Sequence, residues 1–385
     1  MIPYASFFYF GVLLYLAVPV LLAAVLKVPT RHIVLASTIL MVVIQYGGGG
    51  GSGRAAGPGL AISRVFLFAM AQWLVAAVFL RLRTCGRNRA VYYSAVALAL
   101  APLVLEKLLP GDVRHVVAFV GISYTTFRAL DVTFGIEDGL ITELPPTIFL
   151  SYMFFFPAIS AGPIDRYRRF LADYRVVRSR EQLLADVDQA IVRIMRGLLY
   201  AFVIAPLIDF YWIARVVHQA GGIALVSYMY AYSLHLFFDF AGYSAFAIGV
   251  GYVLGVRMPE NFNRPFLAQN ITEFWTRWHI SLSSFLRDHV YGRFVLASVR
   301  GRWFRDNRTA SYLGSTLAFG LMGLWHGLAA RYVFYGLYHA LLVVGHGVWT
   351  RSGSFTALGR SPTVARILTF HAVCVGFLIF SGRLF

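Results

Sequence analysis

The chain has 385 residues, of which 59% are hydrophobic and 13% are charged, and its mean hydropathy is +0.68. A soluble domain carries about 25% charged residues, and it could not hold this many apolar side chains without exposing large apolar patches. The composition therefore excludes an ordinary soluble domain and indicates a fold whose solvent is lipid.

The net charge of +17 is not the signature of a nucleic-acid-binding protein. The basic residues do not form a stripe on a polar fold but lie in short loops between apolar runs, as the positive-inside rule expects. All of them except Lys27 and Lys107 are arginine, a residue that also suits anionic lipid head groups and acidic protein partners.

Apolar runs long enough to suggest membrane spans recur along the whole chain. No charge precedes Lys27, and the first run lacks a basic start and an A-x-A cleavage site, so we expect a first span and not a removable signal peptide. The predicted spans cover residues 4–26, 33–46, 60–80, 91–109, 116–134, 146–162, 197–217, 223–250, 309–328, 332–349 and 364–382. The pattern predicts an all-α, multi-pass membrane protein of about ten spans, forming a single domain over residues 1–385.

A glycine-rich stretch from Gly47 to Gly59 separates the second and third runs. It predicts a flexible loop, because glycine and serine place few restrictions on the backbone. It has no Gly-Lys-Ser ending, so it is not a nucleotide-binding loop.

Three arginine clusters predict the orientation of the chain. They lie at residues 81–89, 166–180 and 287–308, and we expect all three to face the cytoplasm. Three apolar runs separate the first two clusters, although an even number of crossings is required. One run must therefore fail to span, and the run 116–134 is the candidate because it holds Arg128 and Asp131 and would suit the lining of a tunnel.

Between the spans, residues 180–196 alternate apolar and charged positions at helical spacing, which predicts an amphipathic helix on the cytoplasmic surface. Cys85 lies in an arginine-rich loop and Cys374 in the last apolar run. We interpret both as structural residues, and we expect neither a disulfide nor a metal site.

The segment 257–296 does not resemble a span. It combines charges with Trp275, Trp278 and His279, and polar groups at such a position in a membrane protein usually line a cavity or a site. A second feature is His326, at the end of an otherwise apolar run, which is either a structural histidine bonded to a carbonyl or a functional one. On the next run, Tyr335 and His339 are four residues apart and share a helix face.

Several long motifs of this chain resemble those of the membrane-bound O-acyltransferase (MBOAT) family, and of its D-alanyl-transferring DltB branch in particular. The family signature is matched by Pro259-x-Asn261-Phe262-x-x-Pro265, Phe274-Trp275-x-Arg277-Trp278-His279-x-Ser281-Leu282, Arg287-Asp288 and Trp325-His326-Gly327. The branch is matched by Gly121–Tyr124, Phe155–Pro157, Gly162–Phe170, Tyr335–Ala340 and Gly376–Gly382. The chain departs from the branch in its glycine-rich loop and at His289, where an aromatic residue is more usual.

The resemblance implies tilted or re-entrant helices around a central tunnel, with His326 as the catalytic histidine and His279 as the second signature histidine. It implies that substrate passes residues of the matched motifs: Asn261, Trp275, Arg277, Trp278, Ser281, Trp325, Tyr335 and His339. It further implies D-alanine as the acyl group, taken from a phosphopantetheine thioester on a small acidic carrier protein, and a polymer of the cell envelope such as teichoic acid as the acceptor. No bound cofactor is expected; accessory membrane proteins could join the cell-membrane enzyme.

The chemistry of acyl transfer is compatible with two histidines. A thioester is already activated, so the enzyme has to deprotonate a hydroxyl and hold both reactants together. A neutral imidazole suits the first task, and burial favours the neutral form. A dry tunnel brings the reactants together and protects the thioester from water.

The carrier should bind where an apolar patch has a basic rim on the cytoplasmic side. Val295 and Leu296 follow Arg287 and Arg293, and in the DltB branch the corresponding segment is the carrier-docking surface. The alternative is a helix that only packs against its own bundle.

Two alternative functions stay open at this point. The first is O-acetylation of an exopolysaccharide, as in the alginate branch of the same family. The second is a transporter or flippase, although the sequence shows no inverted repeat of the kind that transporters often have.

Overall fold

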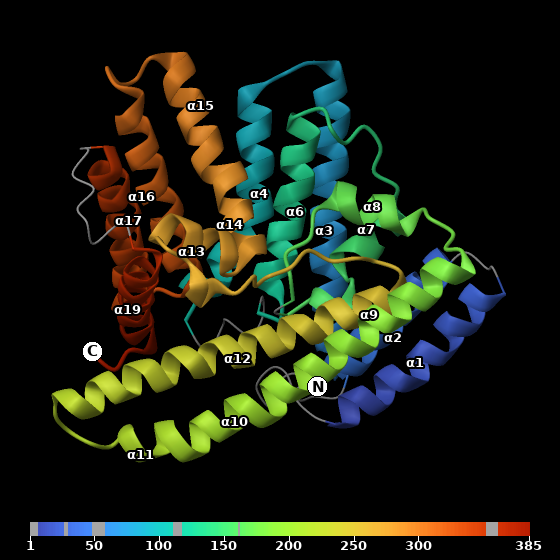
Figure 1. Cartoon of the computed structure of the whole chain (residues 1–385). Coiled ribbons are helices and arrows are strands. Elements are labelled where there is room, and N and C mark those ends of the chain that lie inside the picture. Colours follow the sequence, from blue (N-terminus) through green and yellow to red (C-terminus); the bar gives the residue numbers. More distant parts are fainter. Residues whose placement is uncertain (1–6, 27–29, 48–57, 111–117, 161, 352–360) are drawn as a thin grey trace. The chain divides into compact units, whose positions relative to one another are not determined.

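The computed structural model describes residues 7–26, 30–47, 58–110, 118–160, 162–351 and 361–385. Within these ranges the chain is helical and its one β contact is an isolated bridge, which confirms the predicted all-α fold (Figure 1). Five helical runs of the described chain combine spanning length with an apolar composition: 62–85, 89–108, 180–216, 222–254 and 362–381. The protein is therefore a multi-pass membrane protein, as its composition predicts.

The chain divides into two compact units, one of residues 1–196 with 243–259 and the other of residues 197–242 with 260–385. The long helix α12 (Gly222–Leu254) contributes its first part to the second unit and its last part to the first. The expectation of one integral domain stays a prediction.

The first unit begins with long helices of weakly amphipathic, apolar sequence. Its helices are α1 (Phe7–Val25), α2 (Thr30–Gly47), α3 (Pro58–Cys85), α4 (Arg89–Leu108), α6 (Ile122–Glu137), α7 (Pro146–Met153), α8 (Tyr167–Tyr174) and α9 (Arg180–Leu198). The predicted glycine-rich loop falls mostly outside the described residues; of its ends, Gly47 closes α2 and Pro58 opens α3.

Helix α6 returns the chain to the end of α3. Arg83 and Arg87, at the end of α3 and just after it, both form ion pairs with Glu137, the last residue of α6, at 3.4 and 2.7 Å. The following apolar run 146–162 is broken: α7 ends at Met153, and a 3-10 turn (Phe156–Ala158) follows. Helix α6 has 16 residues, and among the described residues neither it nor the broken run has the length of a span, so the expectation that 116–134 fails to span stays a prediction.

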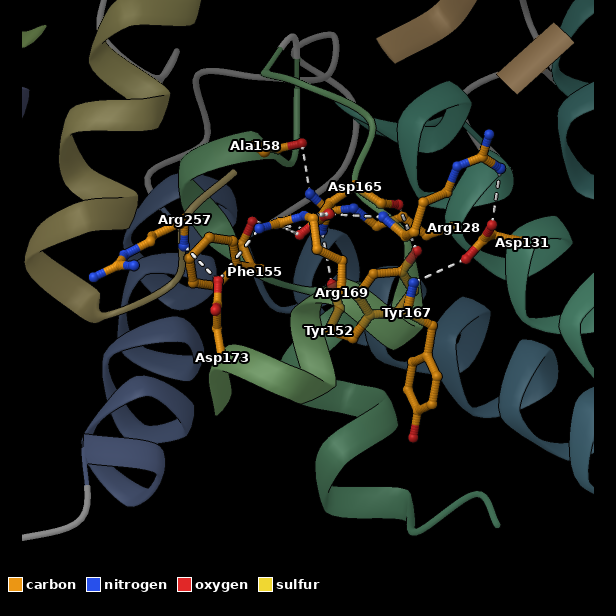
Figure 2. A network of polar contacts seen from close by, with 11 residues as sticks. Arg128, Asp131, Tyr152, Phe155, Ala158, Asp165, Tyr167, Arg169, Asp173 and Arg257 are labelled. Carbon is orange, nitrogen blue, oxygen red and sulfur yellow. Dashed lines mark hydrogen bonds and ion pairs between the residues drawn. The ribbon is translucent and has the colours of Figure 1, made fainter. Parts of the chain in front are cut away.

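A buried arginine explains both this break and the placement of a charge in α6. Arg128 is 1% exposed, and its guanidinium donates hydrogen bonds to the carbonyls of Tyr152 and Ala158 at 2.8 and 2.9 Å (Figure 2). It also donates to the carbonyl of Met153 at 3.0 Å. Tyr152 and Met153 end α7 and Ala158 ends the 3-10 turn, so these carbonyls lie where regular helical hydrogen bonding stops. Arg128 thus stabilises the irregular backbone of the broken run and does not line a tunnel.

A second set of ion pairs anchors α8. Asp131 accepts from Arg166 at 2.9 Å and from the backbone N–H of Tyr167 at 2.8 Å, at the start of α8 (Figure 2). Asp165 pairs with Arg169 of the same helix. Several arginines of the second cluster therefore form ion pairs with buried carboxylates, so their presence in the sequence is not explained by membrane orientation alone.

The second unit holds the chemistry-bearing segment. The amphipathic helix α9 passes without a break through η2 (Leu199–Ile204), α10 (Ala205–Ile208), η3 (Asp209–Ile213) and α11 (Ala214–Val216), so the amphipathic helix and the span predicted after it form one helical run. After α12 come η4 (Pro265–Leu267), α13 (Ile271–Arg277), α14 (Ile280–Leu286), η5 (Arg287–Tyr291), α15 (Gly292–Gly301), α16 (Asn307–His326), α17 (Ala330–Arg351) and α19 (Pro362–Ser381).

Helices α16 and α17 pack closely because two glycines face each other. A Cβ on Gly323 would collide with the carbonyl of Tyr332, and a Cβ on Gly336 would collide with the carbonyl of Phe319. Small residues let helix backbones approach in a membrane, where lipid offers no hydrophobic drive for association. The close approach fixes the position of His326 at the end of α16 relative to Tyr335 on α17.

Candidate active site

His279 occupies a strained turn between α13 and α14. Its backbone is left-handed, with φ 43° and ψ 51°, a conformation that few residues other than glycine adopt readily. Its carbonyl accepts from the N–H of Ser283 at 2.9 Å and so begins α14. The side chain is 4% exposed, and its Nδ1 has no hydrogen-bond partner among the described residues.

Asn261 holds this turn in place. Its carbonyl accepts from the N–H of Ile280 at 3.0 Å, and its side-chain oxygen accepts from Ser281 at 2.6 Å. Phe262 beside it forms the isolated antiparallel bridge with Trp278. Asn261 is fully buried, so the Pro-x-Asn-Phe motif serves as a clamp on the residues either side of His279. Asn261 and Ser281 bind each other in this clamp, and a contact with substrate stays a prediction for both.

The start of α13 explains why Arg277 is placed as it is. Asn270 caps the helix by accepting from the N–H of Glu273 at 2.8 Å, and Glu273 accepts in turn from the N–H of Gln269 at 2.7 Å. The same carboxylate pairs with Arg277 one turn later at 2.6 Å. Arg277 is therefore bound in a local ion pair, and its predicted contact with substrate stays a prediction.

Trp278 belongs to an apolar aromatic cluster. Its ring lies 4.7 Å from that of Phe377 and is stacked on Phe274 at 5.6 Å, and the residue is 4% exposed. Phe262 and Phe237 complete its surroundings. The cluster packs α13 against α12 and α19, so the contacts of Trp278 are those of a packing residue.

His326 closes α16 and is surrounded by aromatic rings. Its ring centroid lies 4.5 Å from that of Trp325, 4.9 Å from Phe380 and 6.0 Å from Tyr335. The side chain is half-buried, in contrast to His279. The imidazole is therefore partly accessible while aromatic rings surround it, and its catalytic role stays a prediction.

Trp325 connects the two signature histidines. Its indole lies 4.5 Å from the ring of His326 and 6.2 Å from the ring of His279. Burial, and after it the proximity of His326, lowers the pKa of His279 to about 3. His279 is therefore neutral at physiological pH, as a histidine must be if it is to accept a proton or a hydrogen bond.

His339 and Trp275 place further polar atoms beside this pair. His339 is fully buried, and neither ring nitrogen has a hydrogen-bond partner among the described residues; the same holds for Trp275 Nε1. The His339 ring lies 4.9 Å from Trp275 and 4.7 Å from Tyr335. A Cβ on Gly376 would collide with His339 Nε2, so only glycine fits opposite it. The predicted shared face of Tyr335 and His339 is confirmed.

The surface of α15 carries the residues predicted to bind a carrier. Leu296 is 50% exposed, whereas Val295 is half-buried and packs towards Gly314 of α16. Arg287 is exposed and pairs with Asp288 at 2.9 Å, and Arg293 is half-buried. Of the two predicted apolar contacts, only Leu296 is therefore presented at the surface.

Two further apolar residues beside Leu296 are exposed, although the sequence did not predict them as part of the carrier surface. Val299 is 41% exposed and Trp303 is 57% exposed. Val299 and Trp303 follow Leu296 by three and seven residues. The three-residue spacing could have predicted that Val299 shares a helix face with Leu296. We call Leu296, Val299 and Trp303, with the exposed Arg300 and Arg302, the α15 surface.

Among the described residues, no group of three or more His, Cys, Asp and Glu side chains is arranged to hold a metal ion. Cys85 is exposed and Cys374 is buried, and both are free thiols.

Comparisons with known proteins agree with this arrangement. The model of the membrane-bound O-acyltransferase family matches residues 136–385. The chain is 40% identical to a teichoic acid D-alanyltransferase of Bacillus subtilis (strain 168), over 83% of this chain and 85% of the relative. It is 36% identical to the teichoic acid D-alanyltransferase of Streptococcus thermophilus, over 79% of this chain and 78% of that one.

A more distant relative is a probable alginate O-acetylase of Pseudomonas syringae pv. tomato. The two proteins are 31% identical over a region that covers 81% of this chain and 58% of the alginate O-acetylase. The family match covers the segment that holds both signature histidines, and it removes the transporter alternative. The chain belongs to the membrane-bound O-acyltransferase family and is an O-acyltransferase.

Proposed function

We propose that this enzyme transfers D-alanine from a carrier-protein thioester to a hydroxyl group of teichoic acid. The observation that carries the proposal is the likeness to teichoic acid D-alanyltransferases at 36–40% identity over most of both chains. The two histidines around Trp325 support it, because they supply the groups that an acyl transfer needs.

In the proposed reaction His326 acts as the general base. The acceptor oxygen attacks the thioester carbon while His326 takes the hydroxyl proton. The C–S bond then breaks, the new ester is released, and the thiolate of the phosphopantetheine arm takes up the proton to become a thiol. Protons balance over the whole step, so neither a metal nor a redox partner is required.

His279 is proposed to act from the donor side. It is neutral because it is buried, and its Nδ1 is unpaired, so it can hold a hydrogen bond from the donor arm or direct the proton towards the leaving sulfur. Phe240 and Trp325 hold its ring at 4.7 and 6.2 Å. The positive φ of its backbone is maintained by the Asn261 clamp, which indicates that the orientation of this imidazole matters.

The donor is proposed to be a phosphopantetheine thioester on an acidic carrier that docks on the α15 surface. Leu296, Val299 and Trp303 form its apolar part, and Arg300 and Arg302 its basic part. Basic residues at the rim speed the encounter with an acidic helix, and the apolar centre supplies much of the affinity.

The alternative, O-acetylation of a polysaccharide such as alginate, has weaker support. The alginate relatives are 30–33% identical, and this chain spans only 51–62% of their length. The donor distinguishes the two functions: a D-alanyl carrier in the first and an acetyl donor in the second.

Reconstitution tests the proposal directly. Purified enzyme in liposomes would be given carrier protein loaded with radiolabelled D-alanine, and lipoteichoic acid as the acceptor. We expect label to become esterified to the polymer, sensitive to mild base, and dependent on His326. If label is transferred only from an acetyl donor and never from the D-alanyl carrier, the proposed substrate is wrong.

A further inference from the structure

Asp239 is an acidic residue in the middle of the long apolar helix α12. The helix is 33 residues long and meets the length and hydropathy criteria for a membrane span. The carboxyl group is exposed, and among the described residues it makes no hydrogen bond and no ion pair. A carboxylate that faced lipid would be costly, so an ionisable residue within a span normally faces a protein interior, a water-filled cavity or a ligand.

Asp239 belongs to a polar stripe on one face of α12. Tyr228, Tyr232, His235 and Asp239 follow one another at spacings of four, three and four residues, so they share a helix face. The Tyr228 and Tyr232 rings are stacked at 5.8 Å, and both pack against Cys374 and Leu378 of α19. That helix also carries Phe380, whose ring lies 4.9 Å from His326. The stripe therefore approaches the candidate active site.

Phe240, the residue after Asp239, shows that this turn of α12 lies beside His279. The ring of Phe240 lies 4.7 Å from the imidazole of His279. Asp239 therefore directly precedes Phe240, the residue that contacts His279. It also shares a helix face with Tyr228 and Tyr232, which pack against α19.

His235, one turn before Asp239, adds a second acceptor. Its Nδ1 lies 3.2 Å from the carbonyl oxygen of Ala205, and a carbonyl can only accept, so Nδ1 carries the proton. The other ring nitrogen, Nε2, is a hydrogen-bond acceptor in the tautomer that carries its proton on Nδ1. A carboxylate and an imidazole nitrogen on one face offer two acceptors, and among the described residues Asp239 forms no ion pair with Lys or Arg.

We propose that Asp239, assisted by His235, binds the α-ammonium group of the D-alanyl unit in the donor thioester. A primary ammonium carries three N–H donors and one positive charge, which complements two acceptors and one negative charge. The pair would make Asp239 a specificity-determining residue, selecting an aminoacyl group over a neutral acyl group of the same size. This inference rests on the proposed function.

The test compares two donors that differ only at the recognised group. Carrier protein is loaded with D-alanine or with propionate, which has hydrogen in place of the ammonium, and transfer to lipoteichoic acid is measured as kcat/KM for each. We expect wild-type enzyme to prefer the D-alanyl carrier. In Asp239→Asn that preference falls at least about tenfold, the low end of what a hydrogen bond to a charged group contributes.

Two further variants make the result specific. His235→Gln removes the second acceptor and should lower the same ratio by a smaller factor, which gives an independent measurement if Asp239→Asn does not fold. Asp209→Asn removes an exposed carboxylate from η3 of the same unit and should leave the ratio unchanged.

The outcomes distinguish failure of the proposed function from failure of ammonium recognition by Asp239. If wild-type enzyme uses neither donor, the proposed function fails. If wild-type enzyme prefers D-alanine and folded Asp239→Asn keeps the full preference, or loses both activities equally, Asp239 does not recognise the ammonium and the inference is overturned.

Discussion

At the scale of single residues, the two signature histidines have different surroundings and therefore different expected roles. His326 is half-buried in an aromatic cage at a helix end, whereas His279 is buried in a strained turn. The first can meet a substrate hydroxyl; the second is held neutral and fixed in orientation. Substitutions at the two positions should therefore fail in different ways.

Replacement of His326 should abolish the reaction without disturbing the fold. His326→Ala removes the proposed general base, and we expect D-alanyl transfer to fall by about two to four orders of magnitude. The measurement is single-turnover transfer in liposomes, with a thermal unfolding curve in detergent as the folding control. Tyr332→Phe, which keeps the neighbouring ring and removes a hydroxyl, serves as the matched variant. Near-normal turnover by folded His326→Ala would refute the assignment.

Replacement of His279 can separate its backbone role from its imidazole. Asparagine tolerates the left-handed backbone and a β-branched residue does not. His279→Asn should therefore remain folded but lose most activity, whereas His279→Val should also lose stability by about 1–3 kcal/mol. Activity assays and unfolding midpoints on both variants check this. Equal stability of the two would mean that the turn is not strained as described.

The neutral state of His279 has a consequence for stability at low pH. Its pKa is lowered in the folded state, so its contribution is complete above the unfolded-state value of about 6.5 and is lost as pH falls towards 3. Between pH 7 and pH 5 the wild type should lose about 2 kcal/mol more than His279→Asn. Unfolding midpoints of both proteins at the two pH values give the comparison; parallel losses would show that His279 does not titrate in this way.

At the scale of elements, α15 combines one face that packs with one face that is free. Val295 packs towards Gly314 of α16, and Ser298 is buried, while Leu296, Val299 and Arg300 are exposed. Exposed apolar residues beside arginines are what an acidic, amphipathic carrier helix would contact. Substitutions on the exposed face of α15 should therefore affect carrier binding, whereas substitutions on its packed face should also affect stability.

A negative charge on the exposed face should prevent carrier binding. Leu296→Asp places a carboxylate opposite an acidic partner, and we expect at least about a tenfold loss of carrier affinity, equivalent to about 1.4 kcal/mol, with the fold intact. Titration of purified carrier against the variant measures this. Val177→Asp, an exposed apolar position in the loop before α9, is the control and should bind normally.

The outcome for Val295 should differ in kind. Val295→Asp buries a charge against α16, so it should lower the unfolding midpoint as well as carrier binding. If Leu296→Asp binds the carrier with wild-type affinity, the carrier docks elsewhere.

At the scale of the whole molecule, the predicted orientation can be measured on the native chain. Cys85 is exposed at the end of α3, where the first arginine-rich loop begins, and Cys374 is buried. If that loop is cytoplasmic, an impermeant maleimide should label the wild-type protein in inverted membrane vesicles but not in intact cells. Cys85→Ser is the background for adding Arg168→Cys or Arg300→Cys, both exposed positions in the other two clusters. Labelling of Cys85 from outside intact cells would reverse the predicted topology.

Arg178 is unsuitable for this measurement, although it lies in the second cluster. It is 9% exposed and pairs with Asp186 at 3.4 Å while donating to the carbonyl of Tyr252 at 3.0 Å. A cysteine there would remain unlabelled on either side of the membrane.

The sequence by itself determined the solvent of this protein, its helical class and the identity of its signature histidines. Long apolar runs permit few alternatives in lipid, because every backbone polar group must be satisfied internally. The motifs around His279 and His326 identified the family, since they are long and combine rare residues. Periodicity also predicted the shared face of Tyr335 and His339, because a helix places residues four apart together.

Only the tertiary structure decided how the polar residues are used. Arg128 and Asp131 suggested a tunnel lining, but long-range hydrogen bonds commit them to the backbone of α7 and α8. Val295 and Leu296 look alike in sequence, yet packing against Gly314 covers the first and leaves the second exposed. Hydropathy reports whether a residue can be buried; which partner buries it depends on contacts between segments far apart in the chain, and local sequence does not encode them.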